Sequence, residues 1–233
     1  MMIAAPLPPA ALVFDLDGTL VDSLPDMLAA FNRLLADLAR PPVEADLFRT
    51  WVGDGARVLI ERGLTATGGI PEPGVSAMVT AYLAHYRGHA AEHSQAFPGV
   101  HAVLEHLHAG GHALAVCTNK PADLAHEVLH GLGLARFFST VLGGDSLPVR
   151  KPDPDHVRAT LTALAAGDRP AVMIGDSQND LLAGRGLGLP VVLVSFGYGP
   201  VAADQLGADL VIDDFHALPQ ALATVLGCAT GVA

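Results

Sequence analysis

Short runs of apolar residues alternate with amphipathic stretches along most of the chain. The runs are typical of strands buried on both faces, and they lie at 11–14, 113–117, 139–142, 171–174, 191–194 and 210–212. Between them, apolar residues recur at helical spacing, which predicts helices at 99–109, 122–132, 155–164 and 179–186. Because strands and helices alternate, we predict a parallel sheet with helices on both faces, a Rossmann-like α/β fold.

Residues 21–95 interrupt this alternation. No strand pattern occurs between Asp22 and Gln95, and helices are expected there at 23–38, 44–50, 55–63 and 75–88. An all-helical block placed directly after the first strand is an insertion into the sheet. We therefore predict a helical cap domain at 21–95 and an α/β core domain formed by 1–20 and 96–233.

The composition is that of a globular protein with a net negative charge. Hydrophobic residues make up 51% of the chain, which is enough for a sizeable core. The formal charge of −11 argues against a nucleic-acid partner or an anionic membrane surface. No apolar stretch approaches the roughly 18 residues of a membrane helix, and residues 1–9 lack the basic start of a signal peptide. We expect a soluble cytoplasmic protein, either a monomer or a homodimer.

The strongest candidate chemistry follows the first strand, in Asp15-Leu16-Asp17-Gly18-Thr19. Asp15 and Asp17 lie one residue apart where the apolar run ends, and Gly18 allows the backbone to turn sharply beside them. In an open parallel sheet, the carboxyl ends of the strands border the crevice in which ligands bind. The two carboxylates are therefore expected at the mouth of a site.

Three later segments carry polar residues to the same edge of the predicted sheet. They add a hydroxyl, an ammonium group and two further carboxylates, at Thr118, Lys151, Asp176 and Asp180. Four carboxylates at close range need a counter-charge, and oxygen ligands without histidine or cysteine favour Mg²⁺. The hydroxyl, the ammonium and backbone N–H groups near Gly18 and Asn119 would then hold phosphoryl oxygens. The set predicts a phosphoryl-transfer site.

In their order and type, these residues resemble the four motifs of the haloacid dehalogenase superfamily of phosphohydrolases. The matching positions are Asp15-Leu16-Asp17-Gly18-Thr19, Thr118, Lys151, and Gly175-Asp176 followed by Asp180. The helical insertion resembles the C1 cap of that superfamily. The resemblance extends from about residue 11 to residue 215, nearly the whole chain.

The resemblance implies a role for each residue that would meet the phosphoryl group. Asp15 would be the nucleophile that forms an aspartyl-phosphate. Asp17 would protonate the leaving alcohol and then activate water. Thr118 and Lys151 would bind the phosphoryl oxygens. Dehalogenases of the superfamily lack the second aspartate, so Asp17 favours phosphoryl transfer over dehalogenation.

The resemblance also implies a magnesium site. Mg²⁺ would be held by the Asp15 carboxylate, the Asp17 backbone carbonyl and the Asp176 carboxylate, with Asp180 supporting them from close by.

Residues 51–64 place a glycine-rich turn ahead of a helix and resemble the substrate-specificity loop of bacterial phosphoglycolate phosphatases. Those enzymes also have Thr-Asn-Lys at the second motif, as this chain does at 118–120. The substrate, a small phosphorylated metabolite, would then carry a carboxylate that Arg57 or Arg62 could bind bidentately. Both arginines are equally compatible with surface charges, and Asp54 is an unfavourable neighbour for an anionic substrate.

Other functions share parts of this pattern. A phosphosugar phosphatase or a β-phosphoglucomutase-like mutase would have the same core. A receiver-like module, phosphorylated on aspartate and signalling through a partner, is disfavoured because the cap would cover the surface that the partner needs. A phosphonate hydrolase is excluded, since no lysine lies between Asp22 and Gln95. Three histidines at four-residue spacing, His85, His89 and His93, are interpreted as a solvated helix side rather than a metal face.

Overall fold

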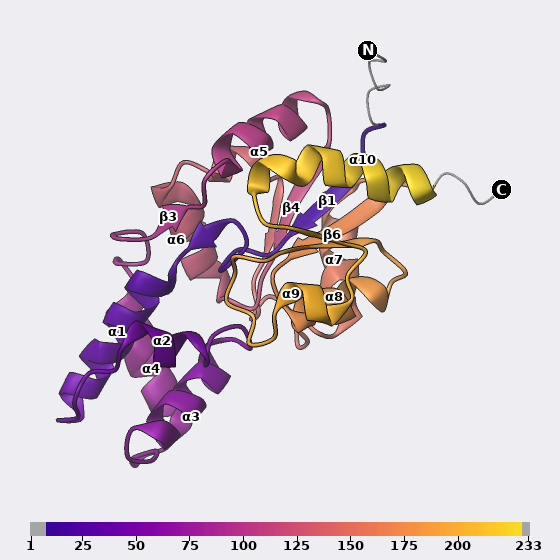
Figure 1. The fold of residues 1–233 in the computed structure, drawn as a ribbon. Helices are drawn as coiled ribbons and strands as arrows, with labels where there is room; N and C mark the ends of the chain where they lie inside the picture. The colour runs from indigo at the N-terminus through magenta and orange to yellow at the C-terminus, as the bar shows by residue number, and fades with distance from the viewer. Residues whose placement is uncertain (1–7, 230–233) are drawn as a thin grey trace.

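A computed structural model describes residues 8–229 of the chain. Its main feature is a six-stranded sheet with the strand order β5-β4-β1-β6-β7-β8, and every pair of neighbours is parallel (Figure 1). The strands are β1 (Ala11–Phe14), β4 (Ala113–Cys117), β5 (Thr140–Leu142), β6 (Ala171–Gly175), β7 (Val191–Val194) and β8 (Leu210–Ile212). The parallel α/β prediction is confirmed, and the strands lie where the apolar runs predict them.

Helices cover both faces of the sheet, because successive side chains of a strand point to opposite sides. Leu12 and Phe14 of β1 belong to one apolar cluster and Val13 to another. The first cluster includes residues of α5 (Val100–Ala109), α6 (Ala122–Gly131) and α10 (Leu218–Ala229), and it continues into the helical block at 24–86. The second includes residues of α7 (Pro154–Leu164) and α8 (Gln178–Arg185). All four residues of β1 are therefore buried, at the centre of the core.

The helical block packs as a separate group to one side of the sheet (Figure 1). Its helices are α1 (Leu24–Asp37), α2 (Ala45–Arg49), α3 (Ala56–Ala66) and α4 (Val75–Tyr86), close to the predicted ranges. The rings of Phe31, Phe48 and Trp51 meet at its centre, with centroids 5.5–5.9 Å apart. The domain boundaries at residues 21 and 95 stay a prediction, and this arrangement is compatible with them.

A two-stranded antiparallel ribbon lies where the chain leaves the sheet region and returns to it. Strand β2 (Val21–Asp22) pairs with β3 (Gln95–Ala96). Each strand has two residues, which is too short for alternation to be visible in the sequence. Four further short or terminal elements were also not predicted, namely η1 (Ala135–Phe137), α9 (Ala203–Leu206), η2 (Phe215–Ala217) and α10.

The interpretation of the three histidines as one helix side is wrong. Helix α4 ends at Tyr86, and Gly88 has φ +79°, a left-handed conformation that breaks the helical path. His89 and His93 therefore lie beyond the helix. Each histidine faces a different acid: His85 contacts Asp37, His89 contacts Glu92, and His93 contacts Asp26.

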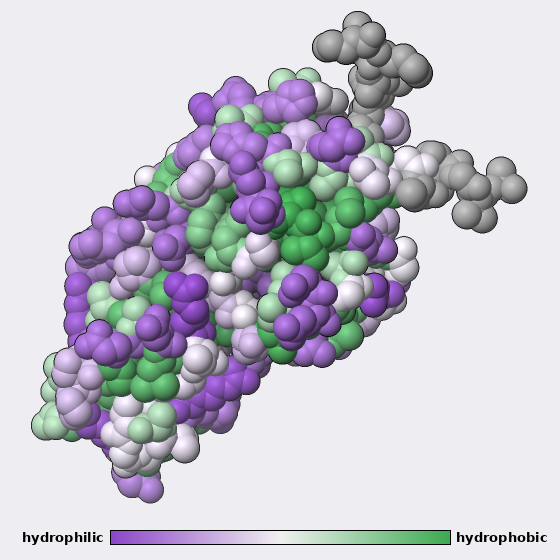
Figure 2. Space-filling model, in the orientation of Figure 1, coloured by the Kyte–Doolittle hydropathy of each residue, from purple (hydrophilic) through white to green (hydrophobic). Residues whose placement is uncertain are grey.

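The surface is mixed in character. On the face drawn in Figure 2, hydrophilic residues follow much of the outline, whereas apolar residues gather below α10. Among residues 8–229 there is no helix with the length and apolar content to span a bilayer. Most of the segment considered for a signal peptide lies outside the described residues.

Candidate active site

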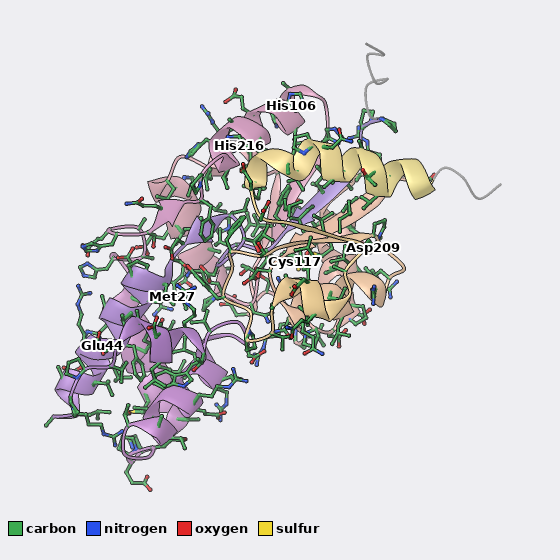
Figure 3. All side chains as sticks on the ribbon, viewed as in Figure 1. Met27, Glu44, His106, Cys117, Asp209 and His216 are labelled. Atoms are coloured by element: carbon green, nitrogen blue, oxygen red, sulfur yellow. The ribbon has the colours of Figure 1, made fainter. Side chains whose placement is uncertain are left out.

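The carboxyl ends of three adjacent strands meet at one cavity. Asp15 follows β1, Thr118 follows β4 and Asp176 follows β6, and β1 pairs with both of the others. The three side chains and Asp17 line a cavity of about 340 Å³ between the sheet edge and the helical block. Figure 3 labels Cys117, the last residue of β4, and Met27, a cavity-lining residue on α1. The geometry therefore brings together residues separated by up to 161 positions in the chain.

Lys151 lies beneath this group and is almost fully buried. Its Nζ contacts Asp15 Oδ1 at 3.0 Å and Asp180 Oδ1 at 2.6 Å. Burial alone would lower the pKa of Lys151, but the two carboxylates outweigh it and raise that pKa above its ordinary value. The lysine is therefore held as a cation between two acids.

Hydrogen bonds orient the two carboxylates that follow β6. Asp176 Oδ2 accepts hydrogen bonds from the backbone N–H groups of Tyr198 and Gly199, at 2.6 and 3.2 Å. Asp180 Oδ2 accepts from the Ser177 hydroxyl and from the N–H groups of Asp176 and Ser177, which completes a capping box at the start of α8. Asp180 thus both caps a helix and faces Lys151.

Gly18 allows the backbone to turn, and its lack of a side chain also makes room for a neighbouring carboxylate. Its φ is +84°, and a Cβ at this position would come within 2.6 Å of Asp176 Oδ2. Gly197 packs on the other side, where a Cβ would lie 2.4 Å from the same oxygen. The two glycines leave room for the carboxylate at the floor of the cavity.

The negative charge of the carboxylates around Lys151 exceeds the positive charge of that lysine. Burial raises the pKa of Asp15 to about 6, although Lys151 opposes the shift, and Asp180 adds to it. Burial, with the charges of Asp180 and Asp15, raises the pKa of Asp176 well above its ordinary value. One lysine does not neutralise three acids, two of them buried and Asp15 partly so, and this group of side chains therefore favours an additional cation.

The same three acids have the spacing of a metal site. One carboxylate oxygen from each of Asp15, Asp176 and Asp180 lies within 4.8 Å of the others. The donors are all hard oxygen atoms, which suits a cation such as Mg²⁺. The cluster could therefore bind a divalent metal ion, because it is negatively charged and offers oxygen ligands.

Asp17 has a cationic partner that was missed among the candidate site residues. Lys120 Nζ lies 3.0 and 3.2 Å from the two oxygens of Asp17, and Ser23 Oγ donates to Asp17 at 2.6 Å. The same Nζ also bonds to the Tyr86 hydroxyl of α4 at 2.7 Å and lies 4.6 Å from the centroid of that ring. Lys120 directly follows Thr118-Asn119 at a strand end, and this position was the signal that could have identified it.

Thr118 and Asn119 face different surroundings. Thr118 is buried, and its Oγ1 accepts from the Lys120 backbone N–H at 3.2 Å, so its own proton is available to a ligand. The Asn119 side chain donates to Gly53 O at 3.0 Å and Lys151 O at 2.9 Å. The Asn119 NH2 group is therefore engaged by protein, whereas its buried Oδ1 has no hydrogen-bond partner among the described residues. The phosphoryl contact of its backbone N–H stays a prediction.

Only one of the two predicted cap arginines reaches the cavity. Arg62 lines it, with Nη2 2.6 Å from Asp54 Oδ2. Arg57 is not among the lining residues, because its side chain turns to Glu61 at 3.2 Å and to Ser76 at 3.2 Å. Asp54 therefore lies beside Arg62 as a partner, and Arg57 has no geometric support as a substrate ligand.

Comparison with known proteins gives consistent relatives. A protein from Caulobacter vibrioides named phosphoglycolate phosphatase is 45% identical over 93% of this chain and 92% of its own length. A protein of the same name from Agrobacterium fabrum is 40% identical over 95% of each chain.

Solved structures agree in fold. A predicted phosphoglycolate phosphatase from Haemophilus somnus superposes with a TM-score of 0.86 at 33% identity, covering 91% of this chain and 97% of that one. CbbY from Rhodobacter sphaeroides, solved in complex with phosphate, gives a TM-score of 0.77 at 26% identity, covering 91% and 96%. The sequence profile of the haloacid dehalogenase-like hydrolases matches residues 12–194. The chain therefore belongs to the haloacid dehalogenase-like hydrolase family.

Proposed function

We propose that this protein is a Mg²⁺-dependent phosphatase that hydrolyses a small phosphate monoester, 2-phosphoglycolate, through an aspartyl-phosphate. The observation that carries the proposal is the convergence of Asp15, Asp17, Thr118 and Asp176 on one cavity, with Lys151 beneath Asp15. Relatives 36–45% identical over most of the chain bear the name phosphoglycolate phosphatase, which supports the choice of substrate.

The first half-reaction uses the two aspartates after β1. A carboxylate oxygen of Asp15 attacks phosphorus, a new P–O bond forms, and the bond from phosphorus to the ester oxygen breaks. Asp17 gives its proton to that oxygen, so that the leaving group departs with a hydroxyl and not as an alkoxide.

The second half-reaction releases phosphate. Asp17, now a carboxylate, takes a proton from water, and the water oxygen attacks the phosphorus of the aspartyl-phosphate. The bond to the Asp15 oxygen breaks, which regenerates both aspartates in their starting states. Lys120 and Ser23 would keep the Asp17 carboxylate oriented between the two steps.

The phosphoryl oxygens would be held by cations and N–H or O–H donors. Thr118 Oγ1 and Lys151 Nζ would contact them, together with the backbone N–H group of Asn119. The Gly18 N–H, which the sequence also suggested, already donates to Val21 O at 2.9 Å and is not free for a phosphoryl oxygen. Mg²⁺, when bound by the Asp15 and Asp176 carboxylates and the Asp17 backbone carbonyl, with Asp180 in support, supplies positive charge beside the phosphoryl group.

The cap side of the cavity supports a small anionic substrate. Arg62 lies at this wall and would bind the carboxylate of phosphoglycolate through N–H groups that its pair with Asp54 leaves free. A phosphosugar phosphatase or a mutase remains the alternative, since the core chemistry is shared. A receiver-like module is disfavoured because residues of α3 and α4 help to line the cavity that holds Asp15.

A substrate panel tests the proposal. The purified protein is assayed with Mg²⁺ on phosphoglycolate, sugar phosphates, nucleotides and ethyl phosphate, and kcat/KM is compared. We expect phosphoglycolate to give the highest value and EDTA to abolish turnover until Mg²⁺ is restored. A sugar phosphate preferred tenfold or more would contradict the substrate assignment, and full turnover in EDTA would contradict the metal assignment.

A further inference from the structure

The loop at Gly53–Asp54 is bonded to the core by two asparagine side chains. Asn119 Nδ2 donates to Gly53 O at 3.0 Å. Asn179 Nδ2 donates to Asp54 Oδ1 at 2.8 Å and lies 3.4 Å from Gly53 O. The loop precedes α3, so these bonds connect the helical block directly to the sheet edge.

Both asparagines lie beside the proposed catalytic groups, Asn119 in the loop after β4 and Asn179 in the first turn of α8. Asn119 directly follows Thr118, and its amide also donates to the backbone carbonyl of Lys151 at 2.9 Å. Asn179 lies between Asp176 and Asp180 in the sequence. The loop after β4 and the first turn of α8 therefore each contribute one amide to the same segment of the cap, and these contacts define the position of that segment relative to the phosphoryl site.

Asp54 is held from two sides. Its Oδ2 pairs with Arg62 of the helical block at 2.6 Å, while its Oδ1 accepts the Asn179 amide from the core. Arg62 Nη1 also lies 3.4 Å from the carbonyl oxygen of Trp51, so the arginine spans the base of the loop. The Asp54 and Arg62 side chains remain 35% and 44% exposed, so solvent screens their ion pair and the pair alone holds the loop only weakly.

We infer that Asn179 is a positioning residue that, with Asp54 and Arg62, latches this loop over the cavity and thereby sets the affinity for small substrates. The inference rests on the proposed function and adds a residue to it. Asn179 acts through its Nδ2 donor on Asp54, a contact that holds the wall of the cavity rather than the phosphoryl group. Loss of the contact should therefore weaken substrate binding more than it slows the chemical step.

A double-mutant cycle tests the contribution of the Asn179–Asp54 hydrogen bond to substrate binding. Asn179→Ala, Asp54→Ala and the double variant are compared with the parent protein on the best ester of the substrate panel. We expect KM to rise about tenfold in each single variant, as for the loss of one charge-assisted hydrogen bond, with kcat changed less than threefold. The double variant should be no more than about twofold worse than either single variant, because both remove the same contact.

Asn32→Ala is the matched control. Asn32 exchanges two hydrogen bonds with Val43 inside the helical block and is not among the cavity-lining residues, so its loss should leave KM unchanged. Asp54→Asn keeps an acceptor for Asn179 and should have a KM closer to the parent value than Asp54→Ala.

Three results would overturn the inference. They are additive effects in the double variant, a fall in kcat at constant KM in Asn179→Ala, and a KM in Asp54→Asn as high as in Asp54→Ala. Failure of the proposed substrate is a separate outcome, since the cycle can be run on whichever ester the protein hydrolyses best.

Discussion

Two buried acids and the partly buried Asp15 lie around one buried lysine at the floor of the cavity, and this excess of negative charge governs the behaviour of single residues. The pKa values of Asp15 and Asp176 are raised because burial and neighbouring charges disfavour their ionised forms. Lys151 contacts Asp15 and Asp180, and it opposes the rise in the pKa of Asp15 without cancelling it. Replacing one of these carboxylates by a neutral side chain should therefore lower the enzymatic activity without lowering the stability of the fold.

Asp15→Asn tests this relation. We expect turnover to be lost, because an amide is not a competent nucleophile, while the fold persists. In metal-free buffer above pH 6, the melting temperature should equal or exceed that of the parent protein, since one buried charge has been removed. Steady-state assays and thermal unfolding measure the two effects. Retained turnover would contradict the covalent role of Asp15.

Lys120 offers a second test at this scale. Lys120→Met keeps the length of the side chain and removes the charge that faces Asp17. We expect kcat to fall roughly 10- to 100-fold, because general acid–base catalysis by Asp17 depends on its orientation and charge. Arg158→Met is the control: Arg158 forms an exposed pair with Asp155, and its kcat should not change. An unchanged kcat in Lys120→Met would show that the ion pair has no part in the reaction.

The β2–β3 ribbon and the start of α1 are the elements through which the helical block joins the sheet region. Asp26, in the first turn of α1, accepts hydrogen bonds from the backbone N–H groups of His93 and Ser94 and from the Ser94 hydroxyl, at 2.7–3.0 Å. On the other side, the Tyr198 hydroxyl donates to Asp22 and accepts from the Leu24 N–H. The junction is thus fixed by buried polar contacts rather than by its two short strands.

Asp26→Asn should weaken this junction. Burial alone would raise the pKa of Asp26, but hydrogen bonds from Ser94 and His93 outweigh it and lower that pKa below 3.8. Its contribution to stability is therefore present above about pH 4 and lost as the pH falls through the lowered pKa. We expect the variant to lose about 1–3 kcal/mol of unfolding free energy at pH 7 and to show a flatter decline in acid.

Urea unfolding between pH 2.5 and pH 7 measures the Asp26→Asn effect. Asp168→Asn, at an exposed acid, is the control and should follow the parent curve. Equal unfolding free energies of Asp26→Asn and the parent protein at pH 7 would rule out the stabilising role.

At the scale of the whole molecule, the cavity between the sheet edge and the helical block concentrates negative charge in a protein whose net charge is already −11. A bound cation should therefore stabilise the folded state by mass action. At a free Mg²⁺ concentration 100 times its Kd, the gain is about 2.7 kcal/mol, or roughly 5–10 °C in melting temperature for a chain of this length.

The pH dependence of stability should differ between the metal-free and the Mg²⁺-bound protein. Without a cation, the folded protein binds protons at Asp15 up to about pH 6, whereas the unfolded chain releases them near 3.8. The metal-free protein should consequently lose stability as the pH rises from 4 to above 6. With Mg²⁺ the loss should disappear, because the ionised carboxylates bind the ion. Thermal melts in EDTA and in Mg²⁺ test this, and parallel curves would contradict the proposed site.

The sequence predicted much of the sheet and most of the chemistry, because each of these depends on short-range patterns. Strands such as 113–117 and 191–194 were placed correctly, since residues buried on both faces leave a continuous apolar run. Asp15, Thr118 and Asp176 were identified because they directly follow such runs, and parallel strands bring their carboxyl ends to one edge.

Tertiary structure decided what depends on side-chain direction and on contacts between distant segments. Whether Arg57 or Arg62 reaches the cavity, and which acid Lys120 faces, is set by the packing of α3 and of the loop after β4. The β2–β3 ribbon was invisible because two residues carry no periodicity, and its pairing joins positions more than 70 residues apart. Local composition determined which groups are available to the site, whereas long-range packing determined which of them meet, because hydrogen bonds and ion pairs act only at contact distance.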